Sequence, residues 1–146
     1  MTIISIFIAL GVPFMLLYGR KSNWYRTSLK QILFFGMLLI GLIGFYQSST
    51  NDFRLFFYAI LIIPIYILVD HAFKLMSTKM HKRDFYLWIR YSNEIDYTRA
   101  GMGKNKHIKP SDIVFSISLL ILIVAMSTLG AVLFGNDSLY DKLIGN

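Results

Sequence analysis

The sequence predicts an all-α integral membrane protein with four transmembrane helices, and three observations lead to that prediction. Of its 146 residues, 55% are hydrophobic and 16% aromatic, and the mean hydropathy of +0.55 lies well above ordinary soluble usage. The apolar residues form four blocks with almost no charge inside them, and the basic residues gather between the blocks. The surface helices of a soluble bundle would carry polar residues at every third or fourth place, and these blocks lack such a stripe.

The four apolar blocks have the lengths of membrane spans. They cover about residues 3–18, 29–46, 53–75 and 113–134. At about 1.5 Å per residue they measure roughly 24–35 Å as helices, against a hydrocarbon core of about 30 Å. Helices are expected because a spanning segment in lipid must satisfy its own backbone hydrogen bonds. We therefore expect a single four-span domain over residues 1–146.

The first block is the weakest of the four spans, because it is short and contains Pro13. A cleaved signal peptide is the alternative. Only Met1 and Thr2 precede the apolar run, so there is no basic N-terminal region, and Tyr18-Gly19-Arg20 offers no cleavage site of small residues. We expect a retained membrane anchor.

Charge placement predicts the orientation. Thirteen of the fifteen Lys and Arg residues lie in or beside segments 20–30 and 74–109, which leaves only Arg54 and Lys142 elsewhere. The positive-inside rule then places both segments, including loop 76–111, in the cytoplasm and both termini outside. The net charge of +7 and the pI near 9.7 follow from these membrane-facing segments, so nucleic-acid binding is not expected. Usage rich in Ile, Lys and Phe favours the cytoplasmic (inner) membrane of a bacterium.

Loop 76–111 contains the stretch DFYLWIRYSNEIDY at residues 84–97. Projected as a helix, it gathers Phe85, Trp88 and Ile89 on one face, which predicts an amphipathic helix in the headgroup layer. A docking helix for a partner subunit is the alternative. Gly101 and Gly103 lie in a basic turn that fails the Walker pattern, and anionic lipid headgroups are a further candidate ligand. The candidate contact residues are Phe85, Trp88, Ile89, Arg90, Arg99, Lys104 and Lys106.

Asp70 and His71 are ionisable residues near the cytoplasmic end of the third span. Asp70 and Lys74 are spaced i, i+4, which predicts an ion pair at the interface with both side chains reaching the headgroups. The alternative is functional, since an ionisable residue inside a span is a candidate site and Asp70 with His71 would serve a proton path.

Small residues inside the spans predict helix packing surfaces, because they let helix backbones approach closely in lipid. These residues are Gly41 and Gly44 in the second span and Ser116, Ser127 and Gly130 in the fourth.

Catalytic, metal and cofactor sites are not expected. The chain has no cysteine, and its three histidines lack metal-site spacing. We therefore expect a non-catalytic polytopic subunit or accessory protein of a larger membrane complex, with the bilayer and other subunits as partners. Two alternatives remain: a small immunity protein that neutralises a membrane-acting toxin, and a transporter or lipid-processing enzyme that uses Asp70 and His71.

Overall fold

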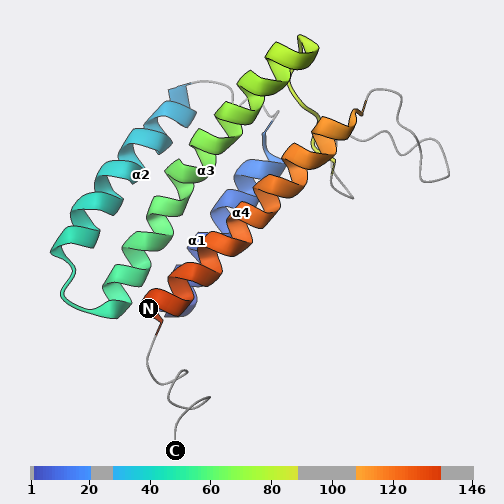
Figure 1. Cartoon of the computed structure of the whole chain (residues 1–146). Coiled ribbons are helices and arrows are strands. Elements are labelled where there is room, and N and C mark those ends of the chain that lie inside the picture. Colours follow the sequence, from blue (N-terminus) through green and yellow to red (C-terminus); the bar gives the residue numbers. More distant parts are fainter. Residues whose placement is uncertain (1, 21–27, 89–107, 136–146) are drawn as a thin grey trace, which may run out of the picture. The chain divides into compact units, whose positions relative to one another are not determined.

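The computed structural model describes residues 2–20, 28–88 and 108–135, and all regular secondary structure in these ranges is helical. The helices are α1 (Thr2–Tyr18), α2 (Ser28–Gln47), α3 (Asn51–His81) and α4 (Pro110–Phe134) (Figure 1). This confirms the all-helical prediction. Three of these helices are long and apolar enough to cross a membrane: α2 over Lys30–Gln47, α3 and α4. Helix α1 is apolar but shorter, with 17 residues.

The connection between α2 and α3 is built from local hydrogen bonds. Thr50 is the N-cap of α3, because its carbonyl accepts the first helical bond, from the Arg54 N–H at 3.0 Å. The Arg54 side chain donates from Nε to the Ser48 carbonyl at 3.3 Å, and the Ser48 hydroxyl bonds back to the Gly44 carbonyl. Asp52 lies in the first turn of α3, where its negative charge meets the positive end of the helix dipole.

Helix α3 is longer than a bilayer requires. Its 31 residues measure about 46 Å, against a hydrocarbon core of about 30 Å, so several turns extend beyond the apolar layer or the helix tilts. The predicted span ended at residue 75, whereas the helix continues to His81. It ends where Lys82 takes a left-handed φ of 56°, a conformation that favours glycine at the end of a helix.

The chain divides into two compact units, which we call unit 1 (Met1–Ile67 and Ile123–Asn146) and unit 2 (Leu68–Leu122). Helices α3 and α4 contribute one part to each unit. In unit 1, Ala9 of α1 lies in a buried apolar cluster with Ala59 and Ile62 of α3, and Met126 of α4 packs against this cluster. Glycines bring α2 close to α3 in the same unit, since a Cβ at Gly41 would lie 2.6 Å from the Leu61 side chain.

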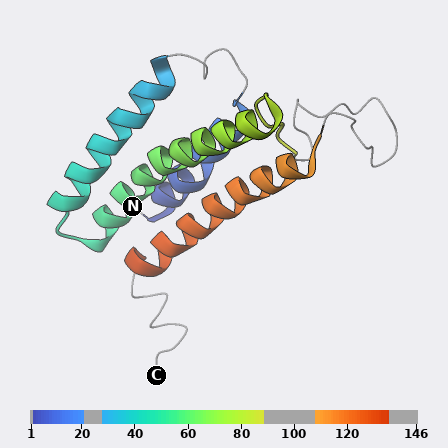
Figure 2. The same cartoon turned by 45° about the horizontal axis from the view of Figure 1, so that its top comes forward.

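Successive helices of unit 1 run in opposite directions. Gly41 lies against Leu61 and Gly44 against Phe57, so rising numbers on α2 meet falling numbers on α3. The N-terminal end of α1, the α2–α3 connection and the C-terminal end of α4 lie at one end of unit 1 (Figures 1 and 2). Unit 1 is therefore an up-and-down arrangement of four helical segments.

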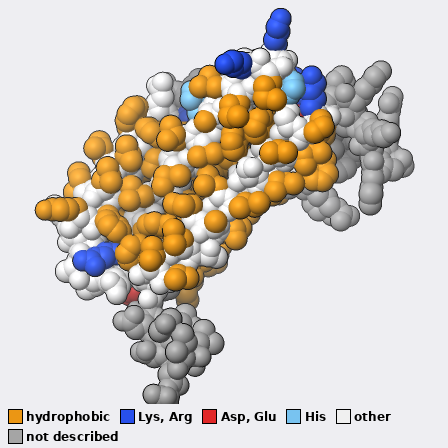
Figure 3. Space-filling view, viewed as in Figure 1, with side chains coloured by type: hydrophobic (Ala, Val, Ile, Leu, Met, Phe, Trp, Pro, Cys, Tyr) orange, Lys and Arg blue, Asp and Glu red, His pale blue; other side chains and the backbone are white. Residues whose placement is uncertain are grey.

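Apolar side chains cover most of the visible surface of the described helices, and Lys and Arg occupy only small areas of it (Figure 3). In the most apolar stretch of each helix, half of the residues of α3 are buried, against 6% in α2 and 17% in α4. In water such a surface would be a large exposed apolar patch. Lipid is its natural environment, and the three long helices agree with a membrane protein.

Unit 2 contains the C-terminal part of α3, the segment 82–88 and the N-terminal part of α4. We call residues 83–88 the strap. The predicted amphipathic helix is wrong for the strap residues 84–88, which are not helical. Burial alternates along the strap: Phe85 and Leu87 are buried, whereas Tyr86 is half-buried and Trp88 is 45% exposed. An alternation with a period of two is typical of an extended chain. The remainder of the predicted helix lies outside the described residues.

Candidate functional site

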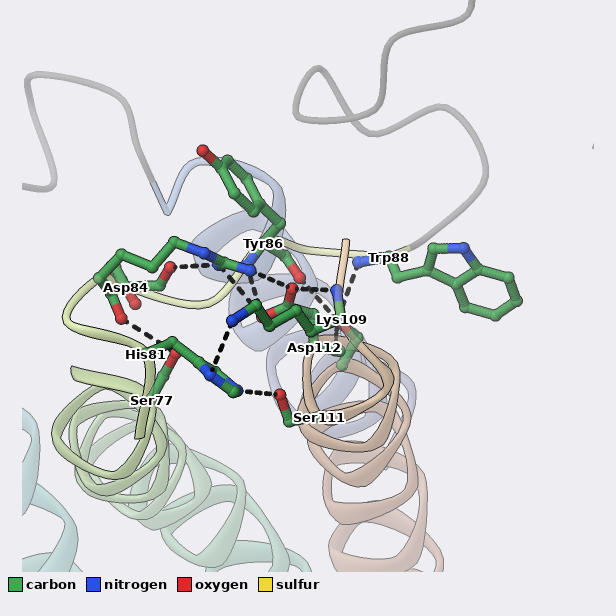
Figure 4. A network of polar contacts seen from close by, with 10 residues as sticks. Ser77, His81, Asp84, Tyr86, Trp88, Lys109, Ser111 and Asp112 are labelled. Carbon is green, nitrogen blue, oxygen red and sulfur yellow. Dashed lines mark hydrogen bonds and ion pairs between the residues drawn. The ribbon is translucent and has the colours of Figure 1, made fainter. Parts of the chain in front are cut away.

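Asp112 is the centre of a hydrogen-bonded cluster in unit 2 (Figure 4). Its side chain is fully buried, and the carboxylate accepts four N–H groups. Arg83 donates from Nη2 to Oδ2 at 2.7 Å and from Nη1 to Oδ1 at 3.3 Å. The backbone N–H groups of Lys109 and Tyr86 donate at 2.8 and 3.3 Å. A buried carboxylate needs such compensation, and the forked Arg contact is among the stronger kinds of hydrogen bond.

The local sequence places Asp112 at the start of α4. Lys109 is the N-cap, because its carbonyl accepts a 2.9 Å bond from the Asp112 N–H, and Pro110 takes the first helical position. Asp112 then reaches back to the Lys109 N–H, as the acidic member of a capping box does. Ser111 is the second residue of α4 and therefore not its N-cap, although serine favours that position. The Ser111 hydroxyl instead contacts His81.

Ser116 attaches the strap to α4. Its buried hydroxyl accepts a 2.8 Å bond from the Trp88 backbone N–H. It also lies 2.7 Å from the Asp112 carbonyl and 3.3 Å from the Tyr86 carbonyl, and its single proton goes to one of them. The N–H groups of Tyr86 and Trp88 are thus satisfied by side chains of α4. This explains why residues 84–88 remain extended instead of closing helical bonds within the segment.

Aromatic rings fill the space beneath the strap. The ring of Phe85 lies between α3 and α4, with its centroid 6.4 Å from Phe73 and 5.5 Å from Phe115. Phe73 and Phe115 stack with centroids 4.9 Å apart. On the opposite side of the strap, the Arg83 guanidinium lies 4.6 Å from the centre of the Tyr86 ring. The strap is therefore held by apolar burial as well as by hydrogen bonds.

His81, the last residue of α3, joins the two helices at the same end of unit 2. Its Nε2 lies 2.7 Å from the Ser111 hydroxyl and its Nδ1 lies 3.2 Å from the Lys109 ammonium (Figure 4). An ammonium group only donates, so Nδ1 is the acceptor of this contact. Nε2 then carries the proton and donates to Ser111. Ser77, one turn earlier on α3, donates to the Arg83 carbonyl at 3.0 Å.

The three ionisable residues predicted as a candidate site on α3 differ from one another in exposure. Asp70 is buried, with 1% of its surface exposed, whereas His71 and Lys74 are exposed. The predicted ion pair between Asp70 and Lys74 stays a prediction, and the structure adds that the acid is buried while the base is exposed.

The predicted packing residues fall into two groups. Gly41, Gly44 and Gly130 lie at close approaches in unit 1, since a Cβ at each would overlap Leu61, Phe57 or Tyr58. Among the described residues, the Ser127 hydroxyl bonds to the Ile123 carbonyl of its own helix, at 2.7 Å, whereas Ser116 holds the strap. Of the predicted contact residues, Phe85 is buried and Trp88 exposed. The others lie outside the described residues: Ile89, Arg90, Arg99, Lys104 and Lys106.

Sequence reasoning missed the partners of Asp112. An acid two residues after a helix-starting proline, as Asp112 is, is a capping signal within the local sequence. Arg83 precedes Asp112 by 29 residues, and no local pattern links them. Sequence reasoning also missed the contact between His81 and Ser111, which are 30 residues apart.

The described residues contain no group of three or more His, Cys, Asp or Glu side chains placed to hold a metal ion. No protein family, curated protein or solved structure matches the chain. The fold and the cluster together define a class: a helical protein with three helices able to cross a membrane and a hydrogen-bonded strap that joins two of them.

Proposed function

We propose that this protein is a non-catalytic polytopic subunit or accessory protein of a larger membrane complex, and that it contacts its partner from the strap and the basic loop that follows it. The observation that carries the proposal is the use of buried polar groups in unit 2. Ser77, Asp112 and Ser116 are fully buried, and each bonds to the chain's own strap or helix ends. Their chemistry holds structure in place, and Trp88 is left 45% exposed at the end of the strap.

Exposed aromatic residues on a rigid support suit protein contacts, since Trp and Tyr lose little conformational freedom on binding and are enriched at interfaces. The strap supplies that rigidity, because hydrogen bonds to Asp112 and Ser116 fix its backbone. The small-residue faces are less suited to a partner. Gly41, Gly44 and Gly130 already lie against side chains of the same chain.

The proposed topology has four spans, with α1 as the fourth and both termini outside the cytoplasm of a bacterial inner membrane. The direction of the helices supports it, because the N-terminal end of α1 and the C-terminal end of α4 lie at one end of unit 1 (Figure 1). A reporter fused after Asn146 should be outside, and one inserted near Lys104 should be inside. A cytoplasmic C-terminus would show that one of the four spans is wrong.

Site-specific photocrosslinking in native membranes tests the proposed contact. A photoreactive phenylalanine analogue at Trp88 should capture one protein that copurifies with the chain. The matched control is the same analogue at Val132, which is 81% exposed on α4 in unit 1 and should capture lipid. The absence of any protein adduct at position 88, in a chain that purifies as a lone monomer, would contradict the proposal. Capture of a toxin peptide would identify the immunity function.

A second candidate function is favoured by the burial of Asp70. A carboxylate with 1% exposure in a helix that is able to span a membrane fits a transporter or lipid-processing enzyme that uses Asp70 and His71. Asp70→Asn preserves shape and removes the charge, and Lys74→Ala is the parallel control. Loss of transport or growth with Asp70→Asn alone, in a chain that still folds, would favour this function over the subunit proposal.

A further inference from the structure

Unit 2 carries an exposed basic surface that the hydrogen-bonded cluster does not use. We call it the basic rim, and its members are exposed lysines near the end of α3 and the start of α4: Lys74, Lys79, Lys82 and Lys109. Lys109 donates one bond to His81, which leaves two of its three N–H donors for other groups. Arg83 does not belong to the rim, because Asp112 holds its guanidinium.

The acidic residues of unit 2 do not balance this surface. Among its described residues the acids are Asp70, Asp84 and Asp112. Asp70 and Asp112 are buried, with 1% and 0% of their surface exposed, and Asp84 is half-buried. Within the part of unit 2 that the structure describes, the rim therefore carries more exposed positive charge than the acids beside it can balance.

The length of α3 places the rim at the depth of lipid headgroups. A span of about 20 residues that begins near Phe53 crosses the hydrocarbon and ends close to Lys74. The remaining residues of α3 extend about 10 Å further, through a headgroup layer some 5–8 Å deep. The long lysine stems also allow each ammonium to adjust its depth.

Trp88 adds a second feature of the same kind. Tryptophan is enriched at the membrane interface, where its ring meets the acyl boundary and its N–H stays hydrated. The Trp88 backbone is fixed to Ser116, and its indole points away from the hydrogen-bonded cluster (Figure 4). The Trp88 backbone is therefore held in place beside the start of α4, while its indole ring is exposed.

We propose that the basic rim and Trp88 form a binding surface for anionic phospholipid headgroups. The lysine ammonium groups meet the lipid phosphates, and the indole packs at the boundary of the acyl chains. Each lysine near an anionic membrane surface contributes about fivefold to affinity. The inference goes beyond the proposed function, because it concerns the purified chain, in which no partner protein covers Trp88 and the indole meets lipid.

The experiment uses the tryptophan as a local reporter. The chain has two tryptophans, so Trp24→Phe leaves Trp88 alone. This variant is reconstituted in phosphatidylcholine vesicles, and Trp88 fluorescence is titrated with brominated phosphatidylglycerol or brominated phosphatidylcholine. We expect the anionic lipid to bind at least about fivefold more tightly. The triple variant Lys79→Gln/Lys82→Gln/Lys109→Gln should bring the ratio of the two affinities, phosphatidylglycerol over phosphatidylcholine, close to one.

Two controls make the result specific. Replacing the same three lysines by arginine keeps the charge and should keep the preference. Arg54→Gln removes a charge at the other end of α3 and should also keep it. A ratio near one before any lysine is changed, no quenching of Trp88 by either lipid, or an unchanged ratio in the glutamine variant would each overturn the proposal. An equal loss in Arg54→Gln would overturn it too, because net charge alone would then be responsible.

Discussion

Unit 1 and unit 2 join the same two helices, α3 and α4, by different means. In unit 1 the contact is made by shape. Gly130 of α4 lies against the ring of Tyr58 on α3, and Met126 and Ile62 contribute to a buried apolar cluster. In unit 2 the strap lies between the helices, and Asp112 and Ser116 bind its backbone.

The difference follows from what each environment offers. In lipid there is no hydrophobic drive to bring helices together, so close packing of small residues against large ones supplies the attraction. Between α3 and α4 the chain must reverse direction, and every buried N–H and C=O of the reversal needs a partner. Unit 2 meets that need with a few polar side chains: Ser77 on α3, Arg83 in the strap itself, and Asp112 and Ser116 on α4. Substitutions that disturb side-chain packing should therefore destabilise unit 1, whereas removal of a single hydrogen-bond acceptor should destabilise unit 2.

The largest effect is expected from Asp112→Ala. The change leaves the Arg83 guanidinium and the N–H groups of Lys109 and Tyr86 without their acceptor. Breaking a buried ion pair by removing one partner costs about 3–5 kcal/mol. The free energy of unfolding, measured in detergent micelles or bicelles, should fall by that amount. The double variant Arg83→Met/Asp112→Ala should lose less than the sum of the two single changes.

A loss below about 1 kcal/mol for Asp112→Ala would show that the strap does not depend on this carboxylate. The contrast between the units would then fail, because unit 2 would rest on its aromatic rings alone.

In unit 1, Gly44→Ala should disturb the fit between α2 and α3. The new methyl group would overlap the ring of Phe57, which must move. Overpacking of this kind costs about 1–3 kcal/mol. Gly36→Ala is the matched control on the same helix, because the space around Gly36 is open, and it should be neutral or slightly stabilising. Equal thermal stability of the two variants would show that α2 does not pack closely on α3.

Two serines of α4 sharpen the comparison. Ser116→Ala removes the acceptor of the Trp88 N–H, which should cost about 1–2 kcal/mol and expose the strap to protease. Ser127→Ala removes only a bond to the helix's own Ile123 carbonyl, so it should change stability by no more than about 0.5 kcal/mol. If both variants behaved alike, in unfolding and in limited proteolysis, the Ser116 hydroxyl would not be what holds the strap.

The smallest effect is expected at the end of α3. Lys82 has a φ of 56°, where a side chain is strained and glycine is not. Lys82→Gly should raise the free energy of unfolding by about 0.5–1 kcal/mol. The unfolding midpoint should rise slightly as a result. Thr78→Gly is a suitable contrast, because Thr78 lies inside the helix and should lose stability by a similar amount. A destabilised Lys82→Gly variant would mean that the lysine side chain supports the turn.

The apolar blocks were enough to predict the helices and most of their bounds. The structure extends α3 from residue 75 to His81 and starts α4 at Pro110 in place of residue 113. Local signals explain both differences, since a left-handed residue follows His81 and proline favours the first position of a helix. The strap was missed because Phe85, Trp88 and Ile89 fit a helical face in sequence, while the acceptors that keep it extended lie on α4.

What the sequence by itself determines is the set of properties that depend on neighbouring residues: helix formation, apolar length, the distribution of charge and the acidic first turn of α4. Tertiary structure alone decided which polar groups meet. Arg83 and Asp112 are 29 residues apart, and Ser116 is buried beneath the strap whereas Ser127 is half-buried without it. The physical reason is that a buried hydrogen bond depends on distances of about 3 Å between groups from separate elements. The period of a single helix carries no information about those distances.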